Sequence, residues 1–541
     1  MENTTSFKRF GIMLDCSRNA VATVDSLKKW IDITTDLGYN TLMLYTEDTY
    51  EVPDNPYFGY MRGRYSCEEL KEVDAYAKEK GMELIPCIQT LAHLNAIVRW
   101  PEYQPHFDID DILLAEDDRV YELIDSMFKT LSSCFTTRIA HIGMDEAHNL
   151  GRGRYLDQHG MQNRFEIMTN HLKKVCDIGA KYGFRFLMWS DMFFRLATGG
   201  KYSSDAKISD EIKKQIPENV DLVYWDYYST DKSHYDQMFV SHEQLKSGTW
   251  FAGGLWSWAG LAPHNGYSMR STEAALTSSK DHRIENVILT MWGDNGGECS
   301  RYALLPSLFY ASELAKGNTD LASIKALFEE KYGIPYDTFM LLDLPGTPDN
   351  DNSGVSNPEK YLLYTDCFLG LFDRNLNGHE KEQFDNATSL LTEVLDTGAA
   401  KEWSYLFASM RDLSAVLAVK ADLGVRTHKA YKSGDKEAVK ALLPVYDELS
   451  KKLEAFYHSY KKQWLTDNKP FGLEVQDARL GALMNRVHSC HDRLEDYCEG
   501  RIAKIEELEA VQLDYCGGGD IDGQDKLRVN NWCSNISTSI V

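Results

Sequence analysis

Eight short apolar segments recur along the first 315 residues, and helical patterns separate each segment from the next. Each segment is nearly continuously apolar, as strands that are buried on both faces of a sheet should be. Eight strands that alternate with helices over roughly 300 residues predict a (β/α)8 barrel. The alternative, an open doubly wound sheet, usually has a glycine-rich first turn, whereas the first turn here reads DCSRNAV. The eight segments are residues 10–15, 40–45, 82–88, 138–144, 184–190, 220–225, 249–255 and 286–292.

Helix start and stop signals lie between these segments. Ser66 and Glu69 have the spacing of a capping box, and the amphipathic stretch that they begin ends at Gly81. A second amphipathic stretch, RFEIMTNHLKKVCDIGAKYG, ends at Gly183. These signals place helices between consecutive strands, as the barrel requires.

The pattern changes beyond the barrel. We expect the catalytic barrel to occupy residues 1–340. Residues 341–358 are rich in Pro, Gly, Asn and Asp and predict a linker or a long loop. Residues 359–515 have helical patterns and predict an α-helical domain, which would either support the barrel or form a homodimer. The last segment, residues 516–541, is expected to be an irregular tail.

The acidic composition limits the partners of the chain. Its 82 Asp and Glu residues outnumber 58 Lys and Arg residues, which gives a formal net charge of −24. Nucleic acids and anionic membranes need basic surfaces, so we expect neither as a partner. No segment approaches the ~20 apolar residues of a membrane helix, and the N-terminus lacks the pattern of a signal peptide, so we expect a cytoplasmic protein. The 11 cysteines include no Cys-x-x-Cys pair and are expected to be free thiols.

Carboxylates and tryptophans gather where the predicted strands end. In a (β/α)8 barrel the catalytic groups follow the carboxyl ends of the strands. Six of the eight ends carry a carboxylate and four carry a tryptophan, whereas a purely structural rim needs neither. Indole rings pack on the C–H faces of sugars, and carboxylates accept hydrogen bonds from sugar hydroxyl groups. This pattern therefore predicts a carbohydrate-binding site. A single tryptophan at such an end is also explained as a cap on the core.

Residues 145–148 spell Asp-Glu-Ala-His, the box of one helicase class. That class needs a phosphate loop, and no Gly-x-x-x-x-Gly-Lys-Ser/Thr segment occurs in the chain. A simpler alternative is that Asp145 caps a helix and Glu146 is solvated. Their position after the fourth strand favours a catalytic pair instead. Successive strand residues point to opposite faces, so the chain must bend at 145–146 for both side chains to reach one pocket.

The segment HIGMDEAH resembles the His-x-Gly-x-Asp-Glu motif of glycoside hydrolase family 20, the β-N-acetylhexosaminidases. LDCSRN is similar to the first-strand motif of the family, whose arginine binds sugar hydroxyls and would be Arg18. MWGDN is similar to its closing Trp-Gly-Glu motif, with Trp292 and with Asp294 in place of the more common Glu. The resemblance covers about 300 residues, and its motifs occur in the order of the family. A small α/β domain often precedes the barrel in this family, whereas we expect the barrel to start at once in this sequence.

The resemblance implies a retaining exo-enzyme that releases terminal β-linked GlcNAc or GalNAc with the help of the substrate's own 2-acetamido group. Glu146 would be the general acid and base, and Asp145 would orient the acetamide. Tyr227 would hold the acetamide oxygen, with Tyr228 as the second choice, because the seventh strand lacks the usual Trp-Tyr pair. No metal or cofactor is implied. The implied substrate-binding residues are Arg18, His93, Trp189, Trp225, Trp256, Trp292 and Asp294.

Two alternatives stay open at this point. A barrel glycosidase that acts on sugars without the acetamido group would pair Glu146 with a distant carboxylate such as Glu47. The other alternative is a barrel that has lost catalysis and only binds carbohydrate, through the tryptophans at its strand ends. The choice between GlcNAc and GalNAc depends on how Arg18, Asp294 and Glu298 meet O4, which the sequence does not decide.

Overall fold

The computed structural model describes residues 5–246, 248–517 and 527–539. The chain divides into two compact units. The first comprises Met1–Leu255, Ser268–Trp292 and Tyr310–Thr319, and the second comprises Trp256–Tyr267, Gly293–Phe309 and Asp320–Val541. Three segments of the expected barrel domain therefore belong to the second unit, and the predicted domain boundaries stay a prediction; the segments are Trp256–Tyr267, Gly293–Phe309 and residues 320–340.

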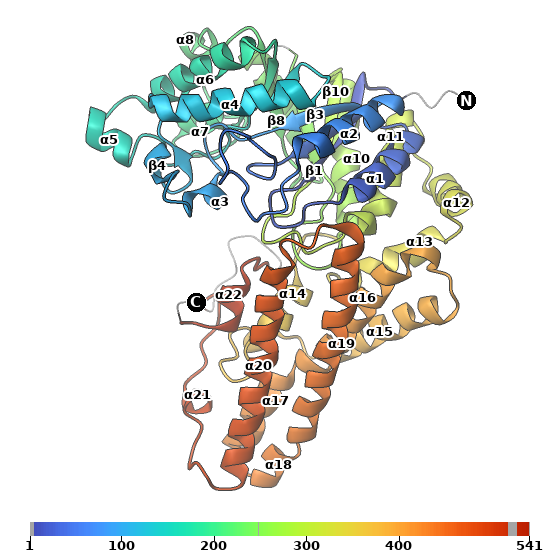
Figure 1. Cartoon of the computed structure of the whole chain (residues 1–541). Coiled ribbons are helices and arrows are strands. Elements are labelled where there is room, and N and C mark those ends of the chain that lie inside the picture. The colour runs from blue at the N-terminus through green and yellow to red at the C-terminus, as the bar shows by residue number, and fades with distance from the viewer. Residues whose placement is uncertain (1–4, 247, 518–526, 540–541) are drawn as a thin grey trace. The chain divides into compact units, whose positions relative to one another are not determined.

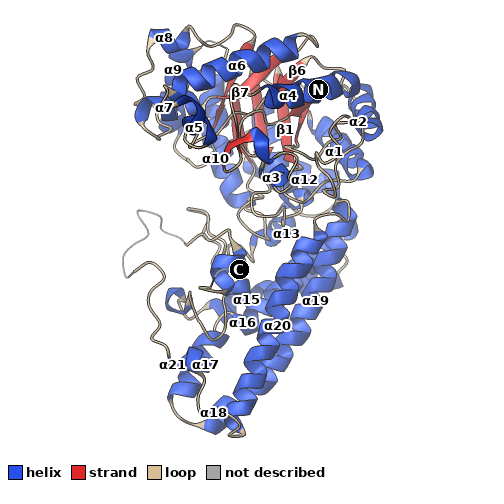
Figure 2. Cartoon of the chain, turned by 60° about the vertical axis from the view of Figure 1, so that its left-hand side comes forward, coloured by secondary structure: helices blue, strands red, loops and turns tan. Residues whose placement is uncertain are grey.

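Eight parallel strands close into a barrel in the first unit, in the order β1-β10-β9-β8-β7-β6-β3-β2. This confirms the (β/α)8 fold and all eight predicted strand segments. Figure 2 shows the strands in red with helices around them. The strands are β1 (Arg9–Asp15), β2 (Thr41–Tyr45), β3 (Glu83–Cys87), β6 (Ile139–His141), β7 (Arg185–Trp189), β8 (Val220–Trp225), β9 (Trp250–Gly254) and β10 (Asn286–Met291).

The register brings four strand ends to one level. Asp15 of β1 pairs with Tyr45 of β2, which pairs with Cys87 of β3, which pairs with His141 of β6. The loops that carry the predicted site residues therefore leave the barrel side by side.

Side chains that point inward fill the barrel. The buried cluster includes Met13, Met43, Ile85, Leu187 and Ile288, all from the middle of their strands. Inward-facing side chains in layers are what a closed eight-stranded barrel requires, because its interior is a packed core and no pore.

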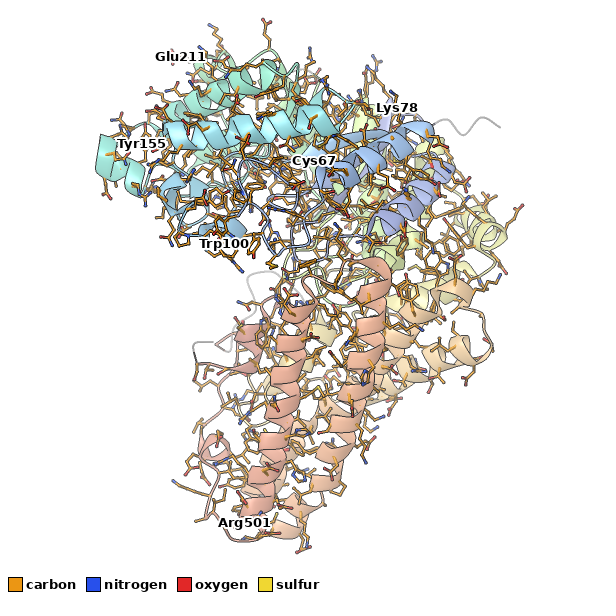
Figure 3. The ribbon with its side chains drawn as sticks, in the orientation of Figure 1. Cys67, Lys78, Trp100, Tyr155, Glu211 and Arg501 are labelled. Carbon is orange, nitrogen blue, oxygen red and sulfur yellow. The ribbon has the colours of Figure 1, made fainter. Side chains whose placement is uncertain are left out.

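The barrel helices alternate with the strands along the chain and lie around them (Figure 1). Helix α2 begins at Cys67 and passes Lys78, both labelled in Figure 3. Its capping box is formed as predicted: Glu69 donates its backbone N–H to Ser66 Oγ at 3.1 Å, and Ser66 donates its own to Glu69 Oε2 at 2.8 Å. The barrel helices are α1 (Val24–Leu37), α2 (Cys67–Glu79), α4 (Asp118–Cys134), α6 (Arg164–Ala180), α7 (Asp191–Thr198), α9 (Lys232–Leu245), α10 (Asn265–Asp281) and α11 (Leu305–Lys316).

Short elements are inserted into the loops between barrel elements. They are α3 (Asn95–Val98), β4 (Phe107–Ile109), β5 (Ile112–Leu113), α5 (Arg154–His159) and α8 (Asp210–Lys213).

The second unit is helical, as predicted for residues 359–515. Its core contains a buried ion-pair cluster in which Glu298 meets Lys360 and, at 2.8 Å, Arg479. The helices are α12 (Leu321–Tyr332), α13 (Tyr336–Met340), α14 (Pro358–Tyr364), α15 (Glu380–Asp396), α16 (Ser404–Lys420), α17 (Leu423–Lys432), α18 (Lys436–Lys440), α19 (Leu443–Asp467), α20 (Leu473–Cys498), α21 (Glu506–Glu509) and α22 (Trp532–Ile536).

The predicted linker, residues 341–358, begins with a 3₁₀ turn at Leu341–Asp343 and ends at Pro358, where α14 begins. Helix α22 forms within the segment expected to be an irregular tail, and residues 518–526 and 540–541 of that segment lie outside the described part of the chain. All 11 cysteines are free thiols, which confirms that prediction. Among the described residues, no helix combines the length and the apolar character needed to cross a membrane.

Candidate active site

The chain bends sharply after β6, as the adjacent carboxylates require. Met144 and Glu146 both have positive φ angles, 71° and 51°, in the left-handed region that non-glycine residues rarely adopt. Two side chains from other strand ends hold this bend. Gln89 Oε1 accepts the backbone N–H of Met144 at 3.2 Å, and Asp191 Oδ2 accepts that of Glu146 at 3.2 Å. Such strain persists where the surroundings over-determine the backbone, and functional sites are where it gathers.

Asp145 is held as a carboxylate by two neighbours. Gln89 Nε2 donates to its Oδ1 at 2.8 Å, and His93 Nε2 lies 3.2 Å from its Oδ2. Burial acts to raise the pKa of Asp145, but the His93 charge and both hydrogen-bond donors lower it. Burial lowers the pKa of His93, yet the Asp145 carboxylate raises it to about 10. The two groups therefore form a carboxylate–imidazolium pair at neutral pH.

His93, Asp145 and Glu146 together could offer three ligand atoms to a metal ion, since these atoms lie within 4.8 Å of one another. A metal ligand must be a neutral imidazole. Nε2 of His93 also lies 3.2 Å from Asp145 Oδ2, the distance of an ion pair.

Glu146 is the more accessible of the two carboxylates. Its side chain is 38% exposed, against 12% for Asp145. His93 Nε2 lies 3.7 Å from Glu146 Oε2, and Arg195 Nη2 lies 3.5 Å from Oε1. Oε1 thus faces the Arg195 guanidinium, whereas His93 lies closer to Asp145 than to Oε2, and the exposed side chain can still reach a bound molecule.

A hydrogen-bonded chain connects Asp145 to Arg18. Gln89 Nε2 also donates to the Tyr45 hydroxyl at 3.0 Å, and that hydroxyl donates to Glu47 Oε1 at 3.0 Å. Arg18 Nη2 donates to the same Glu47 oxygen at 3.1 Å. Burial raises the pKa of Glu47 to about 7, although Arg18 lowers it. The side chains at the ends of β1, β2, β3 and β6 therefore form one polar network.

Aromatic rings lie beside this network. The ring of Trp292 meets that of Tyr45 edge-on at 4.8 Å and that of Trp189 at 6.0 Å. Tyr227 stacks on Trp225 with ring centroids 5.6 Å apart and planes at 22°. Trp225 and Trp292 are only partly buried where they pack against the barrel core. Within the described residues, the buried indole N–H groups of Trp189 and Trp225 have no hydrogen-bond acceptor.

Trp256 and Asp294 belong to the second unit. Trp256 stacks on Trp258 at 4.3 Å and 22°, and Tyr267 meets it edge-on. Their assignment as substrate-binding residues stays a prediction. The remaining predicted residues, which are Arg18, His93, Asp145, Glu146, Trp189, Trp225, Tyr227 and Trp292, belong to the first unit.

Two residues that contact the carboxylate pair were not predicted from the sequence. Gln89 is an amide placed directly after an apolar strand, where its only signal is its polarity. Arg195 lies one helical turn after Asp191 on α7, and Arg195 Nε donates to Asp191 Oδ2 at 3.0 Å. Burial and the Asp145 carboxylate raise the pKa of Asp191 to about 7, while Arg195 lowers it. An i,i+4 acid–base pair is common on helix surfaces, so the sequence alone does not single this one out.

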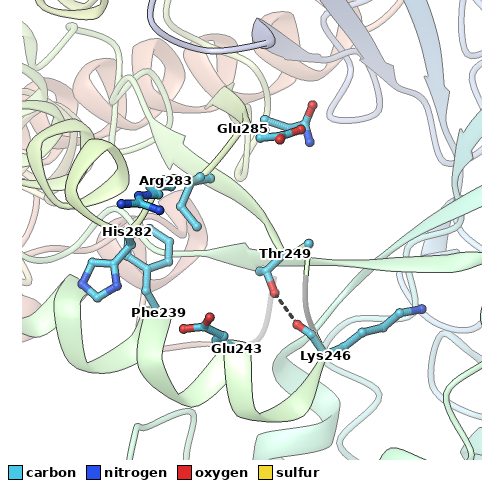
Figure 4. Close-up of a pocket in the computed structure, with 10 residues that line it drawn as sticks. Phe239, Glu243, Lys246, Thr249, His282, Arg283 and Glu285 are labelled. Atoms are coloured by element: carbon cyan, nitrogen blue, oxygen red, sulfur yellow. Dashed lines mark hydrogen bonds between the residues drawn. The ribbon is translucent and has the colours of Figure 1, made fainter.

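A cavity of about 350 Å³ lies at the other end of the strands (Figure 4). It is lined by Thr249, which precedes β9, and by Asn286, the first residue of β10. Thr249 Oγ1 donates to the Lys246 carbonyl there at 3.2 Å. Because the carboxylate pair follows the carboxyl ends of the strands, this cavity is separate from the candidate active site.

Two family models match the chain. The model of the glycosyl hydrolase family 20 catalytic domain matches residues 7–242, and that of the glycoside hydrolase 20C C-terminal domain matches residues 337–526. Hexosaminidase D from Bos taurus is 28% identical over 251 residues, which are 42% of this chain and 63% of that protein. Hexosaminidase D from Homo sapiens is 25% identical over 243 residues, which are 42% of this chain and 46% of that protein. The chain thus spans less than two thirds of the length of these relatives.

Among solved structures, an exo-β-N-acetylglucosaminidase from Vibrio harveyi in complex with N-acetylglucosamine aligns with a TM-score of 0.47 and 17% identity. The alignment covers 63% of this chain and 59% of that chain.

Proposed function

The chain belongs to glycoside hydrolase family 20, and on that premise we propose that it is an exo-acting, retaining β-N-acetylhexosaminidase. Its substrates would be glycans with terminal β-linked GlcNAc or GalNAc. The observation that carries the proposal is the bend at Met144 and Glu146, where both carboxylates lie within 3.7 Å of His93 Nε2.

The mechanism follows from the different surroundings of the two carboxylates. An ordinary retaining glycosidase needs a nucleophilic carboxylate about 5 Å from the acid and across the sugar, which adjacent residues do not easily provide. The substrate's acetamido oxygen would instead attack the anomeric carbon and form an oxazolinium ion. Asp145, held ionised by His93 and Gln89, would accept the acetamide N–H and offset the positive charge that develops there.

Proton transfer is assigned to Glu146. It would protonate the leaving oxygen in the first step and deprotonate water in the second. Its greater exposure supports this role, because both the leaving group and the water must reach it. Tyr227 would donate to the acetamide oxygen, and its stacking on Trp225 places it beside a residue proposed to contact the sugar.

The sugar itself would be bound by the remaining predicted residues. Arg18, aligned by Glu47, would bind hydroxyl groups. The indole N–H groups of Trp189 and Trp225 would find acceptors in the substrate, and Trp292 would offer an apolar face. Trp256, His93 and Asp294 complete the proposed binding set.

Glu47 is a poor candidate for the nucleophile of the alternative mechanism. Burial raises its pKa to about 7, and its Oε1 already accepts from Tyr45 and from Arg18. A binding barrel without catalysis is also disfavoured, because it would have no use for an ionised Asp145 next to an exposed Glu146.

We also propose that the protein is located in the cytoplasm and that it forms a homodimer through the helical unit. The 11 free thiols support a reducing compartment. Equilibrium sedimentation of the whole chain would test the dimer.

Hydrolysis of aryl β-glycosides of GlcNAc, GalNAc and glucose by the purified chain tests the function. We expect turnover of an acetamido sugar and none of glucose, with the β-anomer as the first product by NMR. Asp145→Asn should lower kcat for the acetamido substrate by about 10²–10³-fold. Equal turnover of glucose, or an unaffected Asp145→Asn variant, would exclude assistance by the acetamido group.

A further inference from the structure

Helix α7 contacts Glu146 at two points. Its first residue, Asp191, accepts the backbone N–H of Glu146 on Oδ2. One turn later, Arg195 places Nη2 at 3.5 Å from Glu146 Oε1. The same Asp191 oxygen accepts from Arg195 Nε at 3.0 Å, so the backbone and the side chain of Glu146 are held by one ion pair.

We propose that Arg195, aligned by Asp191, is a positioning residue that selects which oxygen of Glu146 carries the transferred proton. This inference rests on the proposed function of Glu146 as general acid and base. None of the catalytic or substrate-binding residues proposed above lies on α7.

The selection follows from the chemistry of the guanidinium group. Arginine only donates hydrogen bonds and stays charged, so the oxygen that faces it must act as an acceptor. Oε1 of Glu146 faces Arg195, and the acidic proton is therefore placed on Oε2. His93 Nε2 lies closer to Asp145 Oδ2, at 3.2 Å, than to Glu146 Oε2, at 3.7 Å, so Oε2 has the weaker contact with a cation.

Arg195 is held tightly enough to perform this task. Its side chain is only 18% exposed, and Nη1 donates to the carbonyl of Gly200 at 3.2 Å. The guanidinium carbon also lies 5.9 Å from the ring centroids of Tyr202 and of Trp225. Positioned groups save the entropy of orientation at the moment of reaction, and even a small misplacement is costly.

The charge of Arg195 would help in the first step, in which Glu146 loses its proton. In the first step the proton moves from Glu146 Oε2 to the leaving oxygen. The bond between the leaving oxygen and the anomeric carbon breaks, and the acetamido oxygen forms a bond to that carbon. Glu146 becomes a carboxylate, which Arg195 stabilises. In the second step water bonds to the anomeric carbon, the oxazolinium bond breaks, and Glu146 takes back one proton from the water.

The loss of kcat/KM in a variant should depend on the leaving group of the substrate if Arg195 positions Glu146, and should not depend on it if Arg195 is only structural. A 2,4-dinitrophenolate needs almost no protonation to leave, whereas a plain phenolate needs the acid. We expect Arg195→Met to lower kcat/KM for phenyl β-GlcNAc by about 10²-fold and to change the 2,4-dinitrophenyl substrate only a few-fold, since acid–base catalysis contributes about 10²–10⁴-fold. Arg185→Met, on the other end of the strand that leads into α7, is the matched control and should leave both substrates unchanged.

Two further variants keep the test decisive if Arg195→Met folds poorly. Arg195→Lys keeps the charge but lacks the fork that reaches both carboxylates, and should show a smaller loss with the same selectivity. Asp191→Asn should also affect the phenyl substrate more than the dinitrophenyl substrate. Equal losses on both substrates in the folded variants would overturn the inference. Failure of the wild-type chain on every acetamido substrate would instead refute the proposed function.

Discussion

Gln89 Nε2 lies 2.8 Å from Asp145 Oδ1, although 56 residues separate the two in the chain. The same amide accepts the backbone N–H of Met144 through its oxygen and donates to Tyr45 through its nitrogen. One side chain thus fixes the backbone before Asp145, the carboxylate of Asp145 and the network that leads to Arg18.

Replacing Gln89 by Leu should therefore impair catalysis more than binding. The variant removes a donor to Asp145 and leaves buried polar groups unpaired, which costs about 1–3 kcal/mol in stability. We expect kcat for an aryl β-GlcNAc substrate to fall by about 10–100-fold with a smaller change in KM. Gln215→Leu, at an exposed glutamine that accepts a hydrogen bond from Thr169 of α6, is the control. A variant that lowers the melting temperature but keeps kcat would limit Gln89 to a structural role.

Gly143 allows Gln89 to approach the bend. A Cβ at Gly143 would lie 2.0 Å from Gln89 Oε1, and its φ is +71°. Gly160 has a similar φ of +69° but open space around it. We expect Gly160→Ala to lower the free energy of unfolding by about 1–3 kcal/mol from backbone strain alone, because its ψ of −173° lies in a region that essentially only glycine adopts. Gly143→Ala should lower the free energy of unfolding further than Gly160→Ala does. It should also abolish most activity, because Gln89 must move. Urea denaturation and turnover of both variants separate the two effects, and equal behaviour would contradict them.

The pair of His93 and Asp145 predicts how stability depends on pH. His93 has its pKa raised from 6.5 to about 10 in the folded state, with burial opposing the shift and Asp145 causing it. A raised histidine pKa stabilises the fold fully below 6.5, and this contribution is lost as the pH rises through about 10. We expect the melting temperature to fall over this range more in the wild type than in His93→Gln. Parallel curves for the two proteins would show that His93 is not protonated at neutral pH.

Glu47→Gln separates the two mechanisms. If Glu47 only aligns Arg18, the variant should raise KM and lower kcat by no more than about tenfold. If Glu47 were the nucleophile, the loss would be on the order of 10⁶-fold. Steady-state kinetics on an aryl β-GlcNAc substrate decide between these outcomes, with Glu51→Gln as a control on the same loop.

Much of the fold could be predicted because it depends on local patterns. Continuous apolar runs mark strands that are buried on both sides, and the capping box at Ser66 and Glu69 marks a helix start through contacts only three residues apart. The need for a bend at Asp145 and Glu146 followed from the alternation of side chains along a strand. Each of these inferences uses neighbours in the sequence.

The contacts around the carboxylates could not be predicted in the same way. Gln89 and Arg195 reach Asp145 and Glu146 only because β3, β6 and β7 become neighbours when the barrel closes. The protonation of His93 and the raised pKa of Glu47 depend on burial and on charges brought from distant segments. The sequence by itself determined the strands, the helices and the residue types at the strand ends. The tertiary structure alone decided which of these residues meet, because hydrogen bonds and charge interactions act over a few ångströms, a distance set by barrel closure and strand register.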